Sequence, residues 1–283
     1  EVADLGVTDL RALLTQRKVT SVELVREYLR RIHGYDEAYG DQPGLSAVIT
    51  VNDNALEKAA ELDAERRAGR VRGPLHGIPI VVKDNFDTGD MPTTSGSLAL
   101  RDLRPPDDAE QVRRLREAGA IVLAKTNMHE FAMNIYTISS LGGQTRNPYD
   151  QTRHPGGSSG GTGAAVAASY APVGLGSDTC GSIRIPAAHN NLVGLRPTMG
   201  LSSRDGIAPL ASSQDVGGPI GVSVRDVALV LDATAGHDPK DPVTEDSIGQ
   251  VPRTYERTLR KSGLRNTRIG VFTEYFATGT PEE

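Results

Sequence analysis

Two stretches rich in glycine and serine constrain this chain more than any other part of its sequence. The first, at 156–161, reads GGSSGG, and the second, at 177–186, reads SDTCGSIRIP. Glycines on both sides of Ser158 and Ser159 remove Cβ atoms from a sharp turn, so the main chain there can adopt positive φ values and lie close to other groups. We therefore expect two hydroxyl groups presented on an almost bare backbone.

The residues between the two stretches predict one helix and one strand. Thr162 to Ser169 is almost all Ala, Gly and Val, which is typical of a thin helix packed close to a sheet. Pro172 to Gly176 is expected as a short buried strand. Ser182, 24 residues after Ser158, falls where a new helical turn should begin, at the positive end of a helix dipole. The two serine loops should then face each other across a sheet edge. A flexible linker is the alternative meaning of such composition, but apolar, patterned segments flank both loops.

The run from Gly156 to Ala187 resembles the signature of the amidase signature hydrolases at nearly every one of its 32 positions. Upstream, residues 77–85 (GIPIVVKDN) resemble the lysine strand of that family, with Lys83 lying 75 residues before Ser158. Downstream, residues 191–198 (NLVGLRPT) and 214–219 (QDVGGP) resemble its later blocks. The resemblance implies an α/β fold with a mixed β-sheet core covered by helices on both faces.

The resemblance also implies the chemistry of the site. Ser182 would be the nucleophile, Ser158 a bridging proton relay that follows a cis peptide bond, and Lys83 the base. Backbone N–H groups of Thr179, Cys180, Gly181 and Ser182 would hold the oxyanion. Neither a cofactor nor a metal is implied, and none of the six histidines sits in a motif that would place it beside Ser182.

Lys83 ends the apolar run 78–83, a pattern typical of a strand buried on both faces. By local sequence alone, a lysine paired with Asp84 at the surface is the commoner arrangement, and only the serine loops and the spacing argue for a base. To be half neutral near pH 7.4, the lysine pKa must fall by about 3 units from its reference value, which burial can supply.

Three further side chains near these motifs have alternative interpretations. Cys180 departs from the Gly or Ala that the family usually has, and a thiol at a helix start could itself be a nucleophile, although Ser182 would then be unexplained. Asp178 and Arg184 are expected to be structural charges that fix the loop, with contact between Arg184 and an acidic substrate as the alternative. His129 and Glu130 are expected to be a surface pair, because no second histidine stands at ligand spacing from His129.

Composition excludes several classes of function. A formal net charge of −5, without a basic block, argues against nucleic acid and anionic membrane as partners. A single cysteine cannot form an intrachain disulfide, and no run approaches the length of a membrane span, so we expect a cytoplasmic protein.

The rest of the chain predicts alternating helices and strands. Residues 1–283 are expected to form one domain, with 1–70 as a helical arm plus first strand and 71–283 as the catalytic core. Helices are predicted over 8–16, 21–32 (capped by Thr20 or Ser21), 54–68, 107–118 and 223–235, and strands over 45–51, 78–83, 120–125 and 268–272. In the helix at 54–68, we expect Leu56, Ala59, Ala60 and Leu62 to face inward.

The function expected from the resemblance is hydrolysis of a small-molecule carboxamide through an acyl-enzyme, with release of ammonia or an amine. The loop 236–242 resembles the free-standing, peptide-amidase-like branch. The alternatives are a glutaminase subunit of a tRNA-dependent amidotransferase, against which the Asn190-Asn191 context argues, and an inactive binding scaffold. Family members run longer, so we expect a further C-terminal segment or a second chain to complete the fold.

Overall fold

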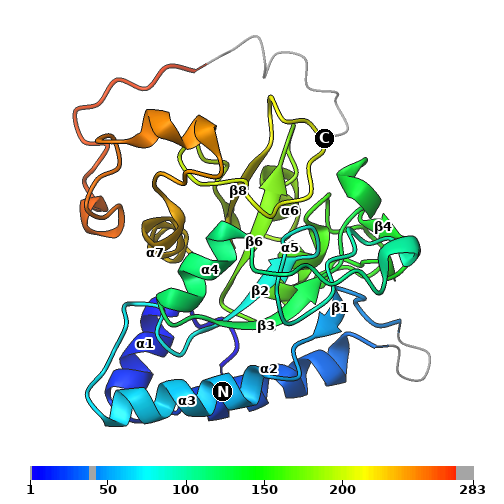
Figure 1. The fold of residues 1–283 in the computed structure, drawn as a ribbon, viewed down its shortest axis with the longest axis horizontal. Helices are drawn as coiled ribbons and strands as arrows, with labels where there is room; N and C mark the ends of the chain where they lie inside the picture. The colour runs from blue at the N-terminus through cyan, green and yellow to red at the C-terminus, as the bar shows by residue number, and fades with distance from the viewer. Residues whose placement is uncertain (1, 38–42, 272–283) are drawn as a thin grey trace.

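The computed structural model describes residues 2–37 and 43–271, and its centre is one mixed β-sheet (Figure 1). The six strands lie in the order β1-β3-β2-β6-β8-β7. Their bounds are β1 Val48–Val51, β2 Pro79–Lys83, β3 Ile121–Thr126, β6 Val173–Asp178, β7 Val193–Gly194 and β8 Val216–Gly221. Strand β2 is parallel to β3 and β6. The pairs β1–β3, β6–β8 and β7–β8 are antiparallel. The expected mixed sheet is therefore confirmed.

Helices surround this sheet, and a short separate hairpin lies outside it. The hairpin pairs β4 (Ile138–Ser139) with β5 (Gly143–Gln144). The α-helices are α1 Val7–Thr15, α2 Ser21–Tyr35, α3 Ala55–Arg67, α4 Glu110–Glu117, α5 Gly160–Ala167, α6 Arg184–His189 and α7 Val224–Thr234. Four 3₁₀ turns are described, namely η1 Leu98–Leu100, η2 Glu130–Ala132, η3 Pro242–Ser247 and η4 Glu256–Thr258. Figure 1 shows α2 and α3 packed side by side along one edge of the molecule.

Both faces of the sheet are covered, as expected. On β6, Gly174 faces Thr162 of α5. On β8, Gly217 faces Gln111 of α4, and because Gly217 pairs with Ser177, an odd number of residues from Gly174, it lies on the opposite face. Helix α7 packs on β8 beside α4. The sheet is therefore a buried layer between helices, which is why β2, β3, β6 and β8 are buried along their whole lengths.

Local capping signals placed the helix starts well. Thr20 caps α2, accepting from the N–H of Glu23, whose carboxylate bonds back to the Thr20 N–H at 2.8 Å. Ser223 caps α7 by accepting from the Asp226 N–H. The prediction of which α3 residues face inward was partly wrong: Ala59 and Leu62 are buried, but Leu56 and Ala60 are exposed. Helix α3 packs mainly against α2 and β3, so its buried stripe is narrow.

One expected strand is absent from the described residues, and one central strand was not predicted. Residues 268–271 have no regular structure, so the strand expected at 268–272 is absent over those four residues, and Phe272 lies outside the described residues. Conversely, β8 was not predicted, because its sequence contains Gly-Gly-Pro. Those glycines pack under neighbouring side chains, so tertiary contacts override weak strand propensity.

The first 70 residues and the rest of the chain share one sheet. Strand β1 pairs with β3, and α2 packs on β2. The organisation as a single domain with an arm over 1–70 remains a prediction. Among the residues that the structure describes, no helix is both long enough and apolar enough to cross a membrane.

The close approach of α5 to the sheet at Gly174 can be tested by substitution. A Cβ atom there would lie 2.7 Å from Thr162 Cγ2 and 2.8 Å from the Val81 carbonyl oxygen, and the backbone atom cannot easily move. We expect Gly174→Ala to lower the free energy of unfolding by about 1–3 kcal/mol, measured by urea titration. Gly34→Ala is the matched control, because a Cβ in that turn of α2 meets nothing within 4 Å. It should raise stability by about 0.5 kcal/mol. Equal effects of the two substitutions would contradict the packing argument.

Candidate active site

Lys83 lies fully buried at the end of β2, where three oxygen atoms surround its side-chain amine. Its Nζ donates to Ser158 Oγ at 2.7 Å, to Ser177 Oγ at 2.8 Å and, more weakly, to the Ser177 carbonyl at 3.4 Å. The parallel pairing of β2 with β6 brings Lys83 and Ser177 to the same edge of the sheet. The structure thus brings together two residues that are 75 positions apart in the sequence, Lys83 and Ser158.

Burial lowers the pKa of Lys83 to about 7, although the carboxylates of Asp178 and Asp215 oppose the shift. Desolvation penalises the ammonium form more than these two negative charges stabilise it. A substantial fraction of Lys83 is therefore neutral near pH 7, and a neutral amine can accept a proton.

The turn that carries Ser158 depends on its glycines. The Gly157–Ser158 peptide bond is cis, as the resemblance implied. A Cβ on Gly157 would lie 2.8 Å from the Ile135 carbonyl carbon, and one on Gly161 would lie 2.2 Å from the Asn127 carbonyl oxygen. Because backbone from two other segments closes over this turn, larger residues could not occupy these positions without moving it.

Ser182 lies on the second loop, directly beside the first. The Ser159 N–H donates to the Ser182 carbonyl at 3.2 Å, which ties the two loops together. Within the described part of the chain, the Ser182 hydroxyl has no hydrogen-bond partner, and its side chain is nearly buried. Helix α6 begins two residues later, at Arg184, so Ser182 precedes a helix start as expected.

Asp178 organises the loop that leads to Ser182. Its carboxylate accepts from the N–H groups of Gly181 at 2.8 Å and Ile183 at 3.0 Å, and from the Arg184 guanidinium at 3.1 Å. Arg196 adds a second cation at 3.0 Å. Arg184 and these backbone hydrogen bonds hold the pKa of Asp178 below its ordinary value against the opposing effect of burial. Asp178 therefore fixes the shape of this loop, as expected, and Arg184 is its ion-pair partner.

The backbone N–H groups of residues 179–182 differ in whether a protein acceptor already binds them. The Gly181 N–H is already engaged by Asp178, contrary to the expectation that it faces an oxyanion. Across residues 2–37 and 43–271, no protein acceptor binds the N–H groups of Thr179, Cys180 or Ser182. Cys180 is exposed and has no positive φ, so its side chain adds no backbone strain there.

The structure shows the partners of three other charged or titratable residues near the site. Asp84 does not pair with Lys83: it accepts from Thr94 Oγ1 and lies 3.4 Å from Lys125 Nζ, inside the core. His129 is half-buried, and its backbone N–H donates to the Ser158 carbonyl at 3.0 Å. Glu130 accepts from the Ser140 N–H at 2.7 Å. Among the described residues, no group of three or more His, Cys, Asp or Glu side chains could hold a metal ion.

Sequence reasoning missed three polar residues around Lys83. Ser177 contacts its amine, Asn85 donates to Ser177 Oγ at 3.0 Å, and Ser159 Oγ donates to the Ser177 carbonyl at 3.1 Å. All three belong to the motifs already singled out, but their contacts depend on the register of β2 against β6. Their positions within those motifs were the only signal that the sequence gave.

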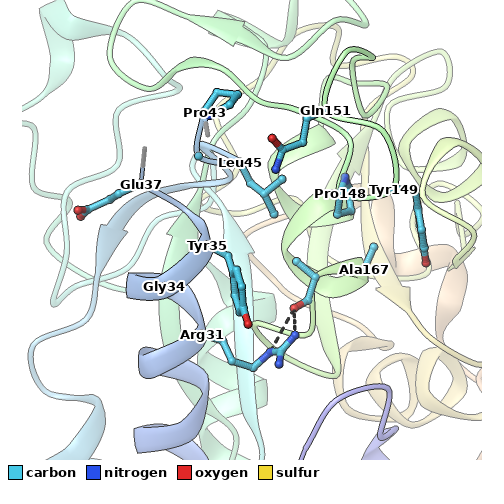
Figure 2. A pocket seen from close by; sticks show the side chains of 12 residues that line it. Arg31, Gly34, Tyr35, Glu37, Pro43, Leu45, Pro148, Tyr149, Gln151 and Ala167 are labelled. Atoms are coloured by element: carbon cyan, nitrogen blue, oxygen red, sulfur yellow. Dashed lines mark hydrogen bonds between the residues drawn. The ribbon is translucent and has the colours of Figure 1, made fainter. Parts of the chain in front are cut away.

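A separate cavity of about 450 Å³ lies at the carboxyl end of α2 (Figure 2). Figure 2 shows Tyr35, Tyr149 and Leu45 on its walls. The Arg31 guanidinium, which also lines the cavity, donates to the Ala168 carbonyl at 2.8 Å. None of the candidate catalytic residues lines it. This cavity is therefore not part of the Lys83 site.

Comparison with known proteins identifies the family of this fold. The family model described as Amidase matches residues 23–283. Native peptide amidase from Stenotrophomonas maltophilia is 50% identical with a TM-score of 0.90, covering 94% of this chain and 55% of that chain. A glutamyl-tRNA(Gln) amidotransferase subunit from Thermobifida fusca is 45% identical over 280 residues, which is 99% of this chain and 54% of that protein.

A solved structure of the corresponding amidotransferase subunit from Thermotoga maritima is 38% identical with a TM-score of 0.67, covering 81% of this chain and 49% of that one. This chain spans about half the length of the relatives it matches. The family model covers most of the chain, and the relatives align over nearly all of it. The chain therefore belongs to the amidase signature family.

Proposed function

We propose that this chain carries the catalytic residues of a serine amidase that hydrolyses a carboxamide C–N bond through an acyl-enzyme. The observation that carries the proposal is the 2.7 Å contact between Lys83 Nζ and Ser158 Oγ, made by a lysine whose pKa is near 7. The adjoining loop presents Ser182, whose hydroxyl is not engaged elsewhere in the described chain.

In this mechanism neutral Lys83 accepts the proton of Ser158, and Ser158 in turn accepts the proton of Ser182. The Ser182 oxygen attacks the amide carbonyl, and the negative charge develops on the carbonyl oxygen. Backbone N–H groups of Thr179, Cys180 and Ser182 would donate to it, and the absence of a protein acceptor for them in the described structure supports this role. The relay then returns the proton to the leaving nitrogen. Water, activated by the same relay, hydrolyses the ester.

The substrate we favour is the carboxamide of a small molecule or short peptide. Peptide amidase is similar over 94% of this chain at a TM-score of 0.90, whereas the amidotransferase subunit of Thermotoga maritima gives 0.67 over 81%. The Asn190 amide donates to the Pro155 and Pro186 carbonyls at 2.7 Å each, so its role is structural.

The second candidate function is the glutaminase subunit of an amidotransferase. It is favoured by the 45% identity to the Thermobifida fusca protein. A panel of peptide amides, alkyl and aryl amides and glutamine separates the two candidates. Turnover of peptide or simple amides by the purified protein alone supports the amidase. Glutamine hydrolysis that appears only with added partner proteins supports the amidotransferase instead.

The role of Ser182 predicts the result of its removal. Ser182→Ala should abolish amide turnover, a loss of at least about 10³-fold, and leave thermal unfolding unchanged, because no core volume is lost. A fluorophosphonate should label the unmodified protein at Ser182, as mapped by mass spectrometry. Cys180→Ser keeps the main-chain N–H, so this control should retain both activity and labelling. An adduct on Cys180 or Ser158 would show that the nucleophile is assigned wrongly.

The role of Lys83 predicts the pH profile. Because only the neutral amine is a base, and burial holds its pKa near 7, kcat should rise with pH through about 7 and then reach a plateau. Lys83→Met keeps most of the side-chain volume and should remove this limb together with most of the rate. A profile that is unchanged in the methionine variant would exclude Lys83 as the base.

A further inference from the structure

We propose that Ser177 and Asn85 form a positioning pair that aims the amine of Lys83 at Ser158 and stabilises the ammonium formed when Lys83 takes a proton. The inference rests on the proposed function, in which Lys83 is the base. Neither residue is expected to touch the substrate. Both would act through Lys83.

The first argument is a match between donors and acceptors. A protonated lysine has three N–H donors, and three protein oxygens surround Lys83 Nζ in the described structure: Ser158 Oγ at 2.7 Å, Ser177 Oγ at 2.8 Å and the Ser177 carbonyl at 3.4 Å. Two of these three acceptors belong to Ser177. A buried ammonium is costly unless its donors are satisfied. Ser177 therefore supplies two of the three hydrogen-bond acceptors around the charged form.

The second argument concerns direction. When the amine is neutral it keeps two N–H donors and gains one lone pair. If the two Ser177 oxygens retain the two N–H donors, the lone pair points at the remaining neighbour, Ser158 Oγ. That is the orientation in which Lys83 can accept the proton of Ser158.

The third argument is that Ser177 is itself held in place. Asn85 Nδ2 donates to Ser177 Oγ at 3.0 Å, and its second contact, to the Ala208 carbonyl at 3.4 Å, sets which end of the amide faces Ser177. Ser159 Oγ donates to the Ser177 carbonyl at 3.1 Å and lies 3.3 Å from its N–H. Ser177 and Asn85 are both buried, so water does not compete for these bonds.

Other charges near Lys83 do not replace this pair. Asp178 and Asp215 favour its ammonium form electrostatically, but no hydrogen bond joins either carboxylate to Nζ in the described structure. Asp178 is committed to Arg184 and Arg196. Two further groups complete the surroundings: half-buried His129 interacts electrostatically with Lys83, and Asp84 on the same strand is paired with Lys125.

The experiment measures the titration of Lys83 directly and through the rate. Protein labelled with ¹³C at the lysine ε-carbon is titrated by NMR, with the Lys83 resonance assigned by its absence in Lys83→Met, and kcat and KM are measured from pH 5 to 9 in parallel. In Ser177→Ala the ammonium loses an acceptor, so the pKa of Lys83 and the acid limb of kcat should both move down by about 1 unit. The plateau kcat should fall about tenfold or more, with KM changed less than about twofold. Ser177→Thr, which keeps the hydroxyl, should restore both.

Asn85→Asp should shift the pKa of Lys83 in the opposite direction. A carboxylate at this position adds a negative charge near Lys83, so its pKa and the acid limb should move up. General damage to the site would not move two variants in opposite directions. Ser202→Ala is the matched control, since this buried serine has an Oγ without a hydrogen-bond partner in the described structure. It should leave the titration unchanged.

The outcomes for this inference and for the proposed function are distinguishable. An unmoved Lys83 resonance and an unmoved rate limb in Ser177→Ala would overturn the positioning pair, as would shifts of the same sign in Ser177→Ala and Asn85→Asp. Retained rate in Lys83→Met would overturn the proposed function alone, because the NMR titration still reports whether Ser177 and Asn85 hold the amine.

Discussion

The arrangement at the centre of this structure depends on one buried amine. Lys83 ends a strand that is covered on both faces, and its Nζ reaches Ser158 Oγ at 2.7 Å. Desolvation there lowers its pKa to about 7, so a side chain that is normally charged at neutral pH is partly neutral. The same burial requires hydrogen-bond acceptors for the charged form. The burial of Lys83 in the sheet therefore determines both how this region must pack and what chemistry we propose for it.

The loops around this amine are shaped by backbone contacts more than by side-chain volume. Gly157 and Gly161 lie under the carbonyls of other segments, and Asp178 binds the N–H groups of the loop before Ser182. Arg184 and Arg196 neutralise Asp178, which limits the negative charge felt by Lys83. Under the proposed mechanism, the exposed side chain of Cys180 at the rim is tolerated, because only its main-chain N–H would be used there.

Much of the fold followed from local signals, and the failures have physical reasons. The capping box at Thr20 and the Ser223 cap located two helix starts, and the apolar run before Lys83 identified a doubly buried strand. Strand β8 escaped notice because its glycines and proline are poor strand formers that are stabilised only by packing. On α3, Leu56 was expected to face inward and is exposed, because no described element covers that side.

The motifs in the sequence were enough to indicate the family, and that resemblance implied that Lys83 and Ser158 act together, which agrees with their contact in the structure. The sequence also identified Asp178 and Arg184 as a structural pair, since they flank one short loop. Only the tertiary structure decided what surrounds the amine. Ser177 and Asn85 meet Lys83 through the register of β2 against β6, and the commitment of the Gly181 N–H to Asp178 depends on how the loop closes. Such contacts arise from three-dimensional pairing of strands and loops, which no local pattern encodes.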